Sequence, residues 1–166
     1  MILSKSEILE LILKEKLVEG YVDLKHQLQP ASFDLTVAQV FALESPATID
    51  FDNSSRKVSK TKEIPWENNE ITLAQGEYKI QYNETVRLPA DIAALTVNRS
   101  SLGRSGCIVQ SGWWDPGYHG KGGSMLTVGK QGLHVKKNAK VAQMVFMRVS
   151  GENTHIYEGA YHKENI

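Results

Sequence analysis

One acidic residue of this chain stands among aromatic residues in a segment suited to a tight turn. Residues 112–118 read GWWDPGY, so Asp115 directly precedes Pro116 and Gly117. Asp before Pro-Gly favours a tight turn, which by itself is the simpler interpretation of the segment. The rings around Asp115 can also offer a flat face to a sugar or base, with the carboxylate beside it as a proton acceptor.

A second group of polar residues precedes this turn. Residues 99–106 read RSSLGRSG and contain Arg99, Ser100, Ser101 and Arg104 together with two glycines. Cations and hydroxyls bind phosphate oxygens, and glycine lets the backbone approach a ligand closely. The octet is therefore consistent with an oligophosphate-binding loop, although a solvated turn with two surface arginines explains it equally well.

Two more polar side chains lie within apolar segments. Gln143 stands in the middle of VAQMVFM, where a buried amide without partners costs about 1–3 kcal/mol. It pairs either with a loop carbonyl or with a ligand oxygen at a strand end or subunit boundary. Asp34, within QPASFDL, stands at the head of another segment, where a lone carboxylate more often caps a turn than binds a metal.

The composition excludes several classes of protein. The five histidines show no metal-ligand spacing, and the single cysteine, Cys107, forms neither an intrachain disulfide nor a Cys-rich zinc site. Nineteen basic residues balance nineteen acidic ones, so we expect neither bulk nucleic acid nor a membrane as a partner. Charged residues interrupt the apolar segment 8–18, and the lone thiol suits a reducing interior, so we expect a cytoplasmic protein.

The remaining pattern predicts a mainly β fold with a short N-terminal helix, in one domain spanning residues 1–166. Residues 1–20 contain a capping box at Ser4 and Glu7 followed by helical apolar spacing, and Gly20 ends the helix. Short apolar segments between turn residues then predict strands at 33–43, 77–82, 92–97, 125–128 and 141–149. In the segment 141–149 most side chains on both faces are apolar, as in a strand buried between two layers. Residues 50–69 are polar and predict an exposed loop or arm.

The order of these motifs resembles the dUTPase and dCTP deaminase superfamily, and in particular its archaeal-type dUTPases. The resemblance rests on QPASFDL, RSSLGRSG, GWWDPGYHG and VAQMVF, with LPAD at 88–91 as a further element. It extends from the N-terminal helix to about Tyr161. It implies a distorted jelly-roll or β-barrel fold that assembles as a homotrimer with active sites between subunits.

The resemblance also implies roles for individual residues and Mg²⁺ as cofactor. Asp115 would contact the deoxyribose and orient the attacking water, Tyr118 would pack under the sugar and exclude ribose, and Asp34 would organise the Mg²⁺-triphosphate indirectly. The other implied substrate contacts are Arg99, Ser100, Ser101, Arg104 and Gln143 for the phosphates, and Val109, Gln110, Ser111, Gly112 and Met125 around the pyrimidine. A carboxylate that accepts the proton of the attacking water, as Asp115 would, typically contributes about 10²–10⁴-fold to the rate.

Met125 separates the two chemistries of this superfamily. Deaminases of the superfamily carry a glutamate ten residues after the aspartate of the DPG turn, and here that position is Met125. The sequence between Asp115 and Glu152 contains no other acid, and a thioether cannot shuttle protons. The resemblance therefore favours hydrolysis of dUTP to dUMP and diphosphate over deamination.

The C-terminal segment departs from the family pattern. Tyr157 and Tyr161 match a family element and are expected to contact the substrate, but HKENI follows where the family has a glycine- and serine-rich lid. In this tail, 157–166, Lys163 can contact phosphates, although a frayed terminus explains it as well. Other functions stay open: a deaminase-like enzyme, a dual dCTP and dUTP pyrophosphatase, a nucleotide-binding regulator, or a structural jelly roll.

Overall fold

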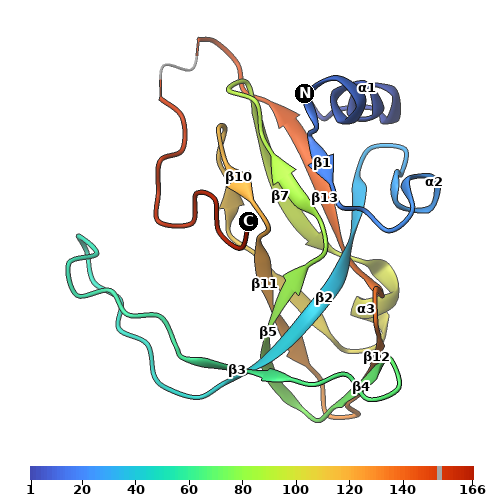
Figure 1. Ribbon diagram of the computed structural model, residues 1–166, viewed down its shortest axis with the longest axis vertical. Coiled ribbons are helices and arrows are strands. Elements are labelled where there is room, and N and C mark those ends of the chain that lie inside the picture. Colours follow the sequence, from blue (N-terminus) through green and yellow to red (C-terminus); the bar gives the residue numbers. More distant parts are fainter. Residues whose placement is uncertain (153–154) are drawn as a thin grey trace.

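The computed structural model describes residues 1–152 and 155–166 and consists mainly of antiparallel strands (Figure 1). The main sheet has the strand order β8 (Ile108–Gln110), β11 (Gly123–Val128), β5 (Gly76–Tyr82), β2 (Phe33–Leu43), β13 (Lys140–Arg148), β7 (Ile92–Asn98) and β9 (Trp113–Trp114), and β3 (Thr61–Ile64) also pairs with β2. The mainly β architecture predicted from the sequence is confirmed, and the five predicted strands correspond to β2, β5, β7, β11 and β13.

Strand β2 makes the sheet curl because it changes neighbours along its length. Its first residues, Phe33 to Thr36, pair with β13, and its later residues pair with β5 and β3. Register shifts interrupt both ladders, one between Lys140 and Ala142 and one between Val37 and Gln39. Such irregularities bend a strand, which lets one long strand serve both halves of a half-barrel.

Two smaller sheets and short helices complete the fold. One small sheet has the order β1 (Val18–Glu19), β6 (Thr85–Arg87) and β10 (His119–Gly120), and the other pairs β12 (Leu133–Lys136) with β4 (Glu70–Leu73). The helices are α1 (Lys5–Glu15), α2 (Leu24–Gln27) and α3 (Ser100–Arg104). In the described residues, no helix is long and apolar enough to cross a membrane.

The N-terminal helix forms as predicted but is shorter than expected. The Ser4 side chain caps the Glu7 amide, and the Glu7 carboxylate accepts a hydrogen bond from the Ser4 amide at 2.9 Å. The helix ends at Glu15 rather than near Gly20 because Lys16 takes the left-handed conformation, with φ of 57°. The chain then enters β1, whose Val18 is buried and paired with β6.

The side chains on the outer face of β13 and β7 are less buried than the sequence predicted. We expected residues 141–149 to be buried on both faces, but only one face is covered in this chain. Val145 and Met147 are partly exposed, and their neighbours Leu95 and Val97 in β7 are each 37% exposed. The strand composition therefore fits a two-sided environment that the single chain does not supply.

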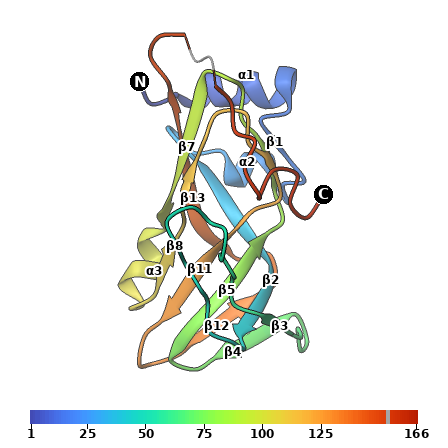
Figure 2. The ribbon, with the colours of Figure 1, turned by 90° about the vertical axis from the view of Figure 1, so that its left-hand side faces the viewer.

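The polar segment predicted as an arm is a long hairpin between β2 and β3. Residues 44–60 project away from the sheet in Figure 1, and Figure 2 shows them in front of β5 and β11. Thr48 and Lys57 form an isolated bridge in this arm, and Phe51 near its tip is fully exposed. The arm begins before residue 50, and residues 61–64 belong to β3 because they pair with the end of β2.

A buried carboxyl ties the β2 strand to the turn before β6. Glu84 is 0% exposed, and its oxygens accept hydrogen bonds from the Gln27 amide at 2.8 Å, from the Thr36 hydroxyl and from the Thr36 backbone N–H at 3.0 Å. Burial raises the pKa of Glu84, and these donors oppose that rise. The network satisfies a polar group that would otherwise be costly to bury.

Replacing Glu84 with glutamine tests this network. The amide has only one accepting oxygen, so at least one of the donors now facing the carboxyl group loses its partner. We expect Glu84→Gln to lower the free energy of unfolding by about 1–3 kcal/mol in urea titrations. The control is Glu77→Gln on the exposed side of β5, which we expect to change stability little; equal effects of the two substitutions would contradict a structural role for the network.

Candidate functional site

A hollow of about 950 Å³ brings together the DPG turn, the arm and the C-terminal tail. Eight of the residues predicted to contact substrate or carry catalysis line it: Gln110, Ser111, Gly112, Asp115, Tyr118, Met125, Tyr157 and Tyr161. The arm and the base of β3 add Ala47, Val58, Ser59, Lys60 and Thr61. Three segments distant in sequence therefore form one concave surface.

The turn that carries Asp115 is held by backbone hydrogen bonds to its neighbours. The Asp115 carbonyl accepts a hydrogen bond from the Tyr118 N–H at 3.1 Å. The Leu88 carbonyl accepts from the Gly117 N–H at 3.0 Å, and the Leu88 N–H donates to the Tyr118 carbonyl at 2.8 Å. Gly117 has a φ of +84°, a conformation that other residues adopt only with strain. The Asp115 side chain is exposed where it lines the hollow, so both water and a ligand can reach the carboxylate.

Trp114 and Tyr118 form an aromatic pair behind the turn. Their ring centroids lie 4.9 Å apart in an edge-to-face arrangement, and both residues are buried. A Cβ at Gly122 would overlap the Trp114 ring, and a Cβ at Gly120 would come within 2.7 Å of the Tyr118 hydroxyl. The glycines after the turn are therefore needed for the close approach of two rings to the backbone.

The strands β8, β11 and β5 contribute a row of side chains to the lining of the hollow. Met125 in β11 pairs with Gln110 in β8 and with Lys79 in β5. Directly paired residues point to the same face of a sheet, and all three line the hollow. β11 begins two residues before the predicted strand at 125–128, because Gly123 already pairs with Gln81 of β5.

Val109, in the same strand as Gln110, lies apart from the hollow. Its side chain is 4% exposed in the core, and its backbone N–H donates to the Asn98 side chain at 2.9 Å. Ser111 lines the hollow and accepts a hydrogen bond from the Trp114 indole at 3.1 Å. Of the segment expected to read a pyrimidine edge, Gln110 and Ser111 face the hollow.

The C-terminal tail docks on the turn through backbone hydrogen bonds. Tyr157 N–H donates to the Pro116 carbonyl at 2.7 Å, Lys163 N–H to the His119 carbonyl at 2.6 Å, and the Lys121 N–H to the Glu164 carbonyl at 2.9 Å. The Lys163 side chain is exposed and does not line the hollow. The Arg56 guanidinium of the arm lies 5.8 Å from the centre of the Tyr161 ring, so arm and tail meet above the hollow.

The residues predicted to hold phosphates lie elsewhere. Asp34 is 0% exposed, and its Oδ2 lies 3.4 Å from Arg99 Nε and 3.1 Å from Lys140 Nζ. Gln143 is paired with Asp34 across the strands and donates to the Ser32 hydroxyl at 3.4 Å. Ser100, Ser101 and Arg104 belong to α3, directly after Arg99, and their side chains are exposed. We call Asp34, Arg99, Lys140 and Gln143 the cation cluster.

The cation cluster and the hollow do not meet within one chain. None of the cluster residues lines the hollow, and Figure 1 places α3 on the side of the sheet away from the arm and the tail. The sequence motifs therefore fall into two separate groups within the chain. Among the described residues, no group of three or more His, Cys, Asp or Glu side chains is placed to hold a metal ion.

Three functional candidates escaped the sequence analysis. Lys140 and Lys79 are single charged residues in strands, and only the strand register shows that one faces Asp34 and the other the hollow. Glu164 lines the hollow from a tail whose polar composition suggested a frayed terminus. Their signals depend on contacts between distant segments, so no local pattern indicated them.

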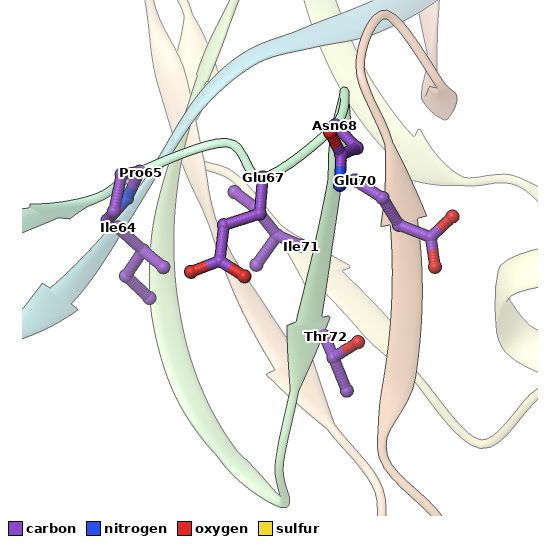
Figure 3. A pocket seen from close by; sticks show the side chains of 7 residues that line it. All are labelled: Ile64, Pro65, Glu67, Asn68, Glu70, Ile71 and Thr72. Atoms are coloured by element: carbon purple, nitrogen blue, oxygen red, sulfur yellow. The ribbon is translucent and has the colours of Figure 1, made fainter.

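A smaller hollow of about 510 Å³ lies between β3 and β4 and contains none of the predicted site residues. Figure 3 shows the carboxylate of Glu67 between Ile64 and Ile71, and the carboxylate of Glu70 turned to the other side of β4. Glu67 and Glu70 also exchange backbone hydrogen bonds across the intervening turn. This hollow is explained by the geometry of that turn.

The packing of Trp114 against Gly122 gives a direct test of the turn. We expect Gly122→Ala to displace the Trp114 ring and to change the near-ultraviolet circular dichroism. The control is Gly112→Ala, whose added methyl group meets nothing within 4 Å and should leave the dichroism unchanged. An unaltered spectrum for Gly122→Ala would show that the rings do not need this close approach.

The sequence has relatives among known proteins. Residues 2–149 match the sequence model of a family described as dCTP deaminase-like. A probable deoxyuridine 5'-triphosphate nucleotidohydrolase from Methanococcoides burtonii is 38% identical, covering 99% of this chain and 99% of that protein. A protein of the same description from Archaeoglobus fulgidus is 40% identical, covering 99% of this chain and 98% of its own length.

A solved structure shares the fold. The 2'-deoxycytidine 5'-triphosphate deaminase from Agrobacterium tumefaciens matches with a TM-score of 0.69 at 22% identity, covering 90% of this chain and 48% of that one. The present chain thus spans about half the length of that protein. With a family match over residues 2–149 and relatives at 38% and 40% identity over nearly their full length, the protein belongs to the dCTP deaminase-like family.

Proposed function

We propose that this protein hydrolyses dUTP to dUMP and diphosphate, with Asp115 activating the attacking water. The proposal rests on the hollow that gathers Asp115, Tyr118 and Met125 at one place. The relatives at 38% and 40% identity are named as probable deoxyuridine 5'-triphosphate nucleotidohydrolases, which supports the same substrate.

The hollow offers a separate group for each part of the nucleoside. Tyr118 contributes ring surface for the deoxyribose, and Trp114 packs against this ring edge-to-face. Gln110 and Ser111 lie at the end where the pyrimidine would sit, beside Met125. Asp115 is exposed next to the sugar platform, where its carboxylate can orient a water and accept its proton.

We propose Mg²⁺ as the cofactor, bound together with the nucleotide. Mg²⁺ usually binds through one or two carboxylates plus substrate phosphates and water, so it needs no protein cage. Asp34 fits an indirect role, because Arg99 and Lys140 already surround its carboxylate. The ion would neutralise charge on the phosphate oxygens, and Arg99 would add a directional donor to them.

We further propose a homotrimer in which each site combines the hollow of one subunit with the cation cluster of another. Two observations on the single chain support this arrangement. The cluster and the hollow are separate, and the outer face of β7 and β13 leaves Leu95 and Val97 open beside Gln143. A second copy would cover the apolar face and bring phosphate-binding groups to the hollow.

Hydrolysis is favoured over deamination by the residue at position 125. Met125 occupies the base end of the hollow, between Gln110 and Lys79, and cannot transfer a proton. An uncharged thioether also discriminates weakly between the 4-oxo and 4-amino groups of pyrimidines, so dCTP is the alternative substrate. Chromatography of the products separates the possibilities: dUMP from dUTP, dCMP from dCTP, or dUTP from dCTP.

The role of Asp115 predicts a specific loss of turnover. We expect Asp115→Asn to bind a non-hydrolysable dUTP analogue nearly as well as the wild type but to hydrolyse dUTP about 10²–10⁴-fold more slowly. Single-turnover hydrolysis with Mg²⁺ measures the rate, and Glu15→Gln at the end of α1 controls for the change of charge. Full activity in Asp115→Asn would remove this residue from the mechanism.

The shared site predicts complementation between two inactive variants. Asp115→Asn and Arg99→Ala damage different half-sites, so neither hydrolyses dUTP efficiently alone. In a mixture that is unfolded and refolded together, up to about a quarter of the wild-type rate should return, because each pocket draws its halves from two subunits at random. Light scattering checks the trimer; an inactive mixture of intact trimers would contradict a site built between subunits.

A further inference from the structure

The C-terminal tail places the carboxyl group of Glu164 beside Tyr118, whose ring is the proposed surface for the sugar and is called the sugar platform below. The Tyr118 hydroxyl donates a hydrogen bond to Glu164 Oε1 at 2.9 Å, and both residues line the hollow. We propose that Glu164 is a positioning residue that fixes the Tyr118 ring and thereby sets the preference for deoxyribose over ribose. This inference rests on the proposed binding of a deoxynucleotide in the hollow.

The Tyr118 hydroxyl depends on this acceptor. Tyr118 is 5% exposed, and the backbone at Gly120 and Gly122 closes around its hydroxyl end. A buried hydroxyl without a partner is unfavourable, so the ring is held where its proton reaches Glu164. Burial raises the pKa of Tyr118 well above its usual range, which keeps the phenol a donor.

The hydrogen bond restrains a movement that the aromatic contacts leave open. Trp114 meets the Tyr118 ring edge-to-face at 4.9 Å, and Tyr157 lies at 5.9 Å in a tilted arrangement. Such contacts tolerate sliding, whereas a hydrogen bond at the para position fixes the ring along its length. A platform that rejects a 2'-hydroxyl by close contact loses selectivity when it can retreat by about 1 Å.

Docking of the tail and restraint of Tyr118 can be separated experimentally. Asn165 also anchors the tail, through its side-chain amide to the Lys121 carbonyl at 2.8 Å, but it does not line the hollow. Glu164 is partly buried, where burial raises the pKa of its carboxyl while Tyr118 and Lys79 oppose that rise. Among the described residues, it is Glu164 that joins the tail to the hydroxyl of Tyr118.

The test measures binding of α,β-imido-dUTP and α,β-imido-UTP by calorimetry, which requires no turnover. We expect Glu164→Ala to reduce the preference for the deoxynucleotide by about tenfold, the effect of losing one charged hydrogen bond. Glu164→Gln keeps an accepting oxygen and should restore the preference to within about threefold of the wild type. Asn165→Ala should leave the preference unchanged while loosening the tail.

A double variant separates positioning from a general effect. If Glu164 acts through the Tyr118 hydroxyl, Glu164→Ala should change the preference no further in a Tyr118→Phe background. An unchanged preference in Glu164→Ala would overturn the proposal. So would a loss as large in Asn165→Ala, or tighter binding of both nucleotides in equal measure, which would mark the tail as a plug.

The binding measurement and the dUTP hydrolysis assay together distinguish this inference from the proposed function. A wild-type protein that prefers the deoxynucleotide but does not hydrolyse dUTP would refute the hydrolase and leave the role of Glu164 measurable. A wild-type protein that hydrolyses dUTP without discriminating the two sugars would refute the role of Glu164 and leave the hydrolase standing. Absence of binding by either analogue would refute both.

Discussion

The site depends on the close packing of Trp114 and Tyr118 against the glycine backbone that follows them. Any side chain at Gly122 would overlap Trp114, and Gly120 lies against the Tyr118 hydroxyl, so the segment from the turn to β11 has almost no freedom. β11 is itself held between β8 and β5. This packing places Asp115 at the rim of the hollow and Met125 at its far end, because both are carried by backbone that the rings immobilise.

Much of the fold could be predicted because its signals are local. The capping box at Ser4 and the apolar alternation of residues 33–43 depend on neighbours within a few positions, and both appear as expected. The end of α1 was misplaced because Lys16 adopts a left-handed conformation that glycine more commonly takes. Burial of residues 141–149 was overestimated because apolar composition does not show which face of a strand the chain covers, and Val145 and Met147 are partly exposed.

The candidate site could be predicted only in part, for a related reason. Each motif indicates a chemical capacity, but whether two motifs meet depends on register and on the path of the chain. Gln143 and Asp34 are neighbours because β13 pairs with β2, whereas Asp115 is remote from both. Glu164 was overlooked because its importance comes from contact with Tyr118, a residue 46 positions earlier. No rule based on the spacing of residues in the sequence predicts a contact between two residues so far apart.

The distribution of charge indicates how a nucleotide would lie. The hollow contains the acids Asp115 and Glu164 against Lys60 and Lys79, so its charges balance and it cannot by itself hold a triphosphate. Arg99 and Lys140 share a single buried carboxylate, Asp34, which leaves the cation cluster with net positive charge. A triphosphate is therefore stabilised only where such a cluster approaches the rim of the hollow. Base and sugar would occupy the balanced interior, and the phosphates would leave past Asp115 toward the cations of a neighbouring subunit.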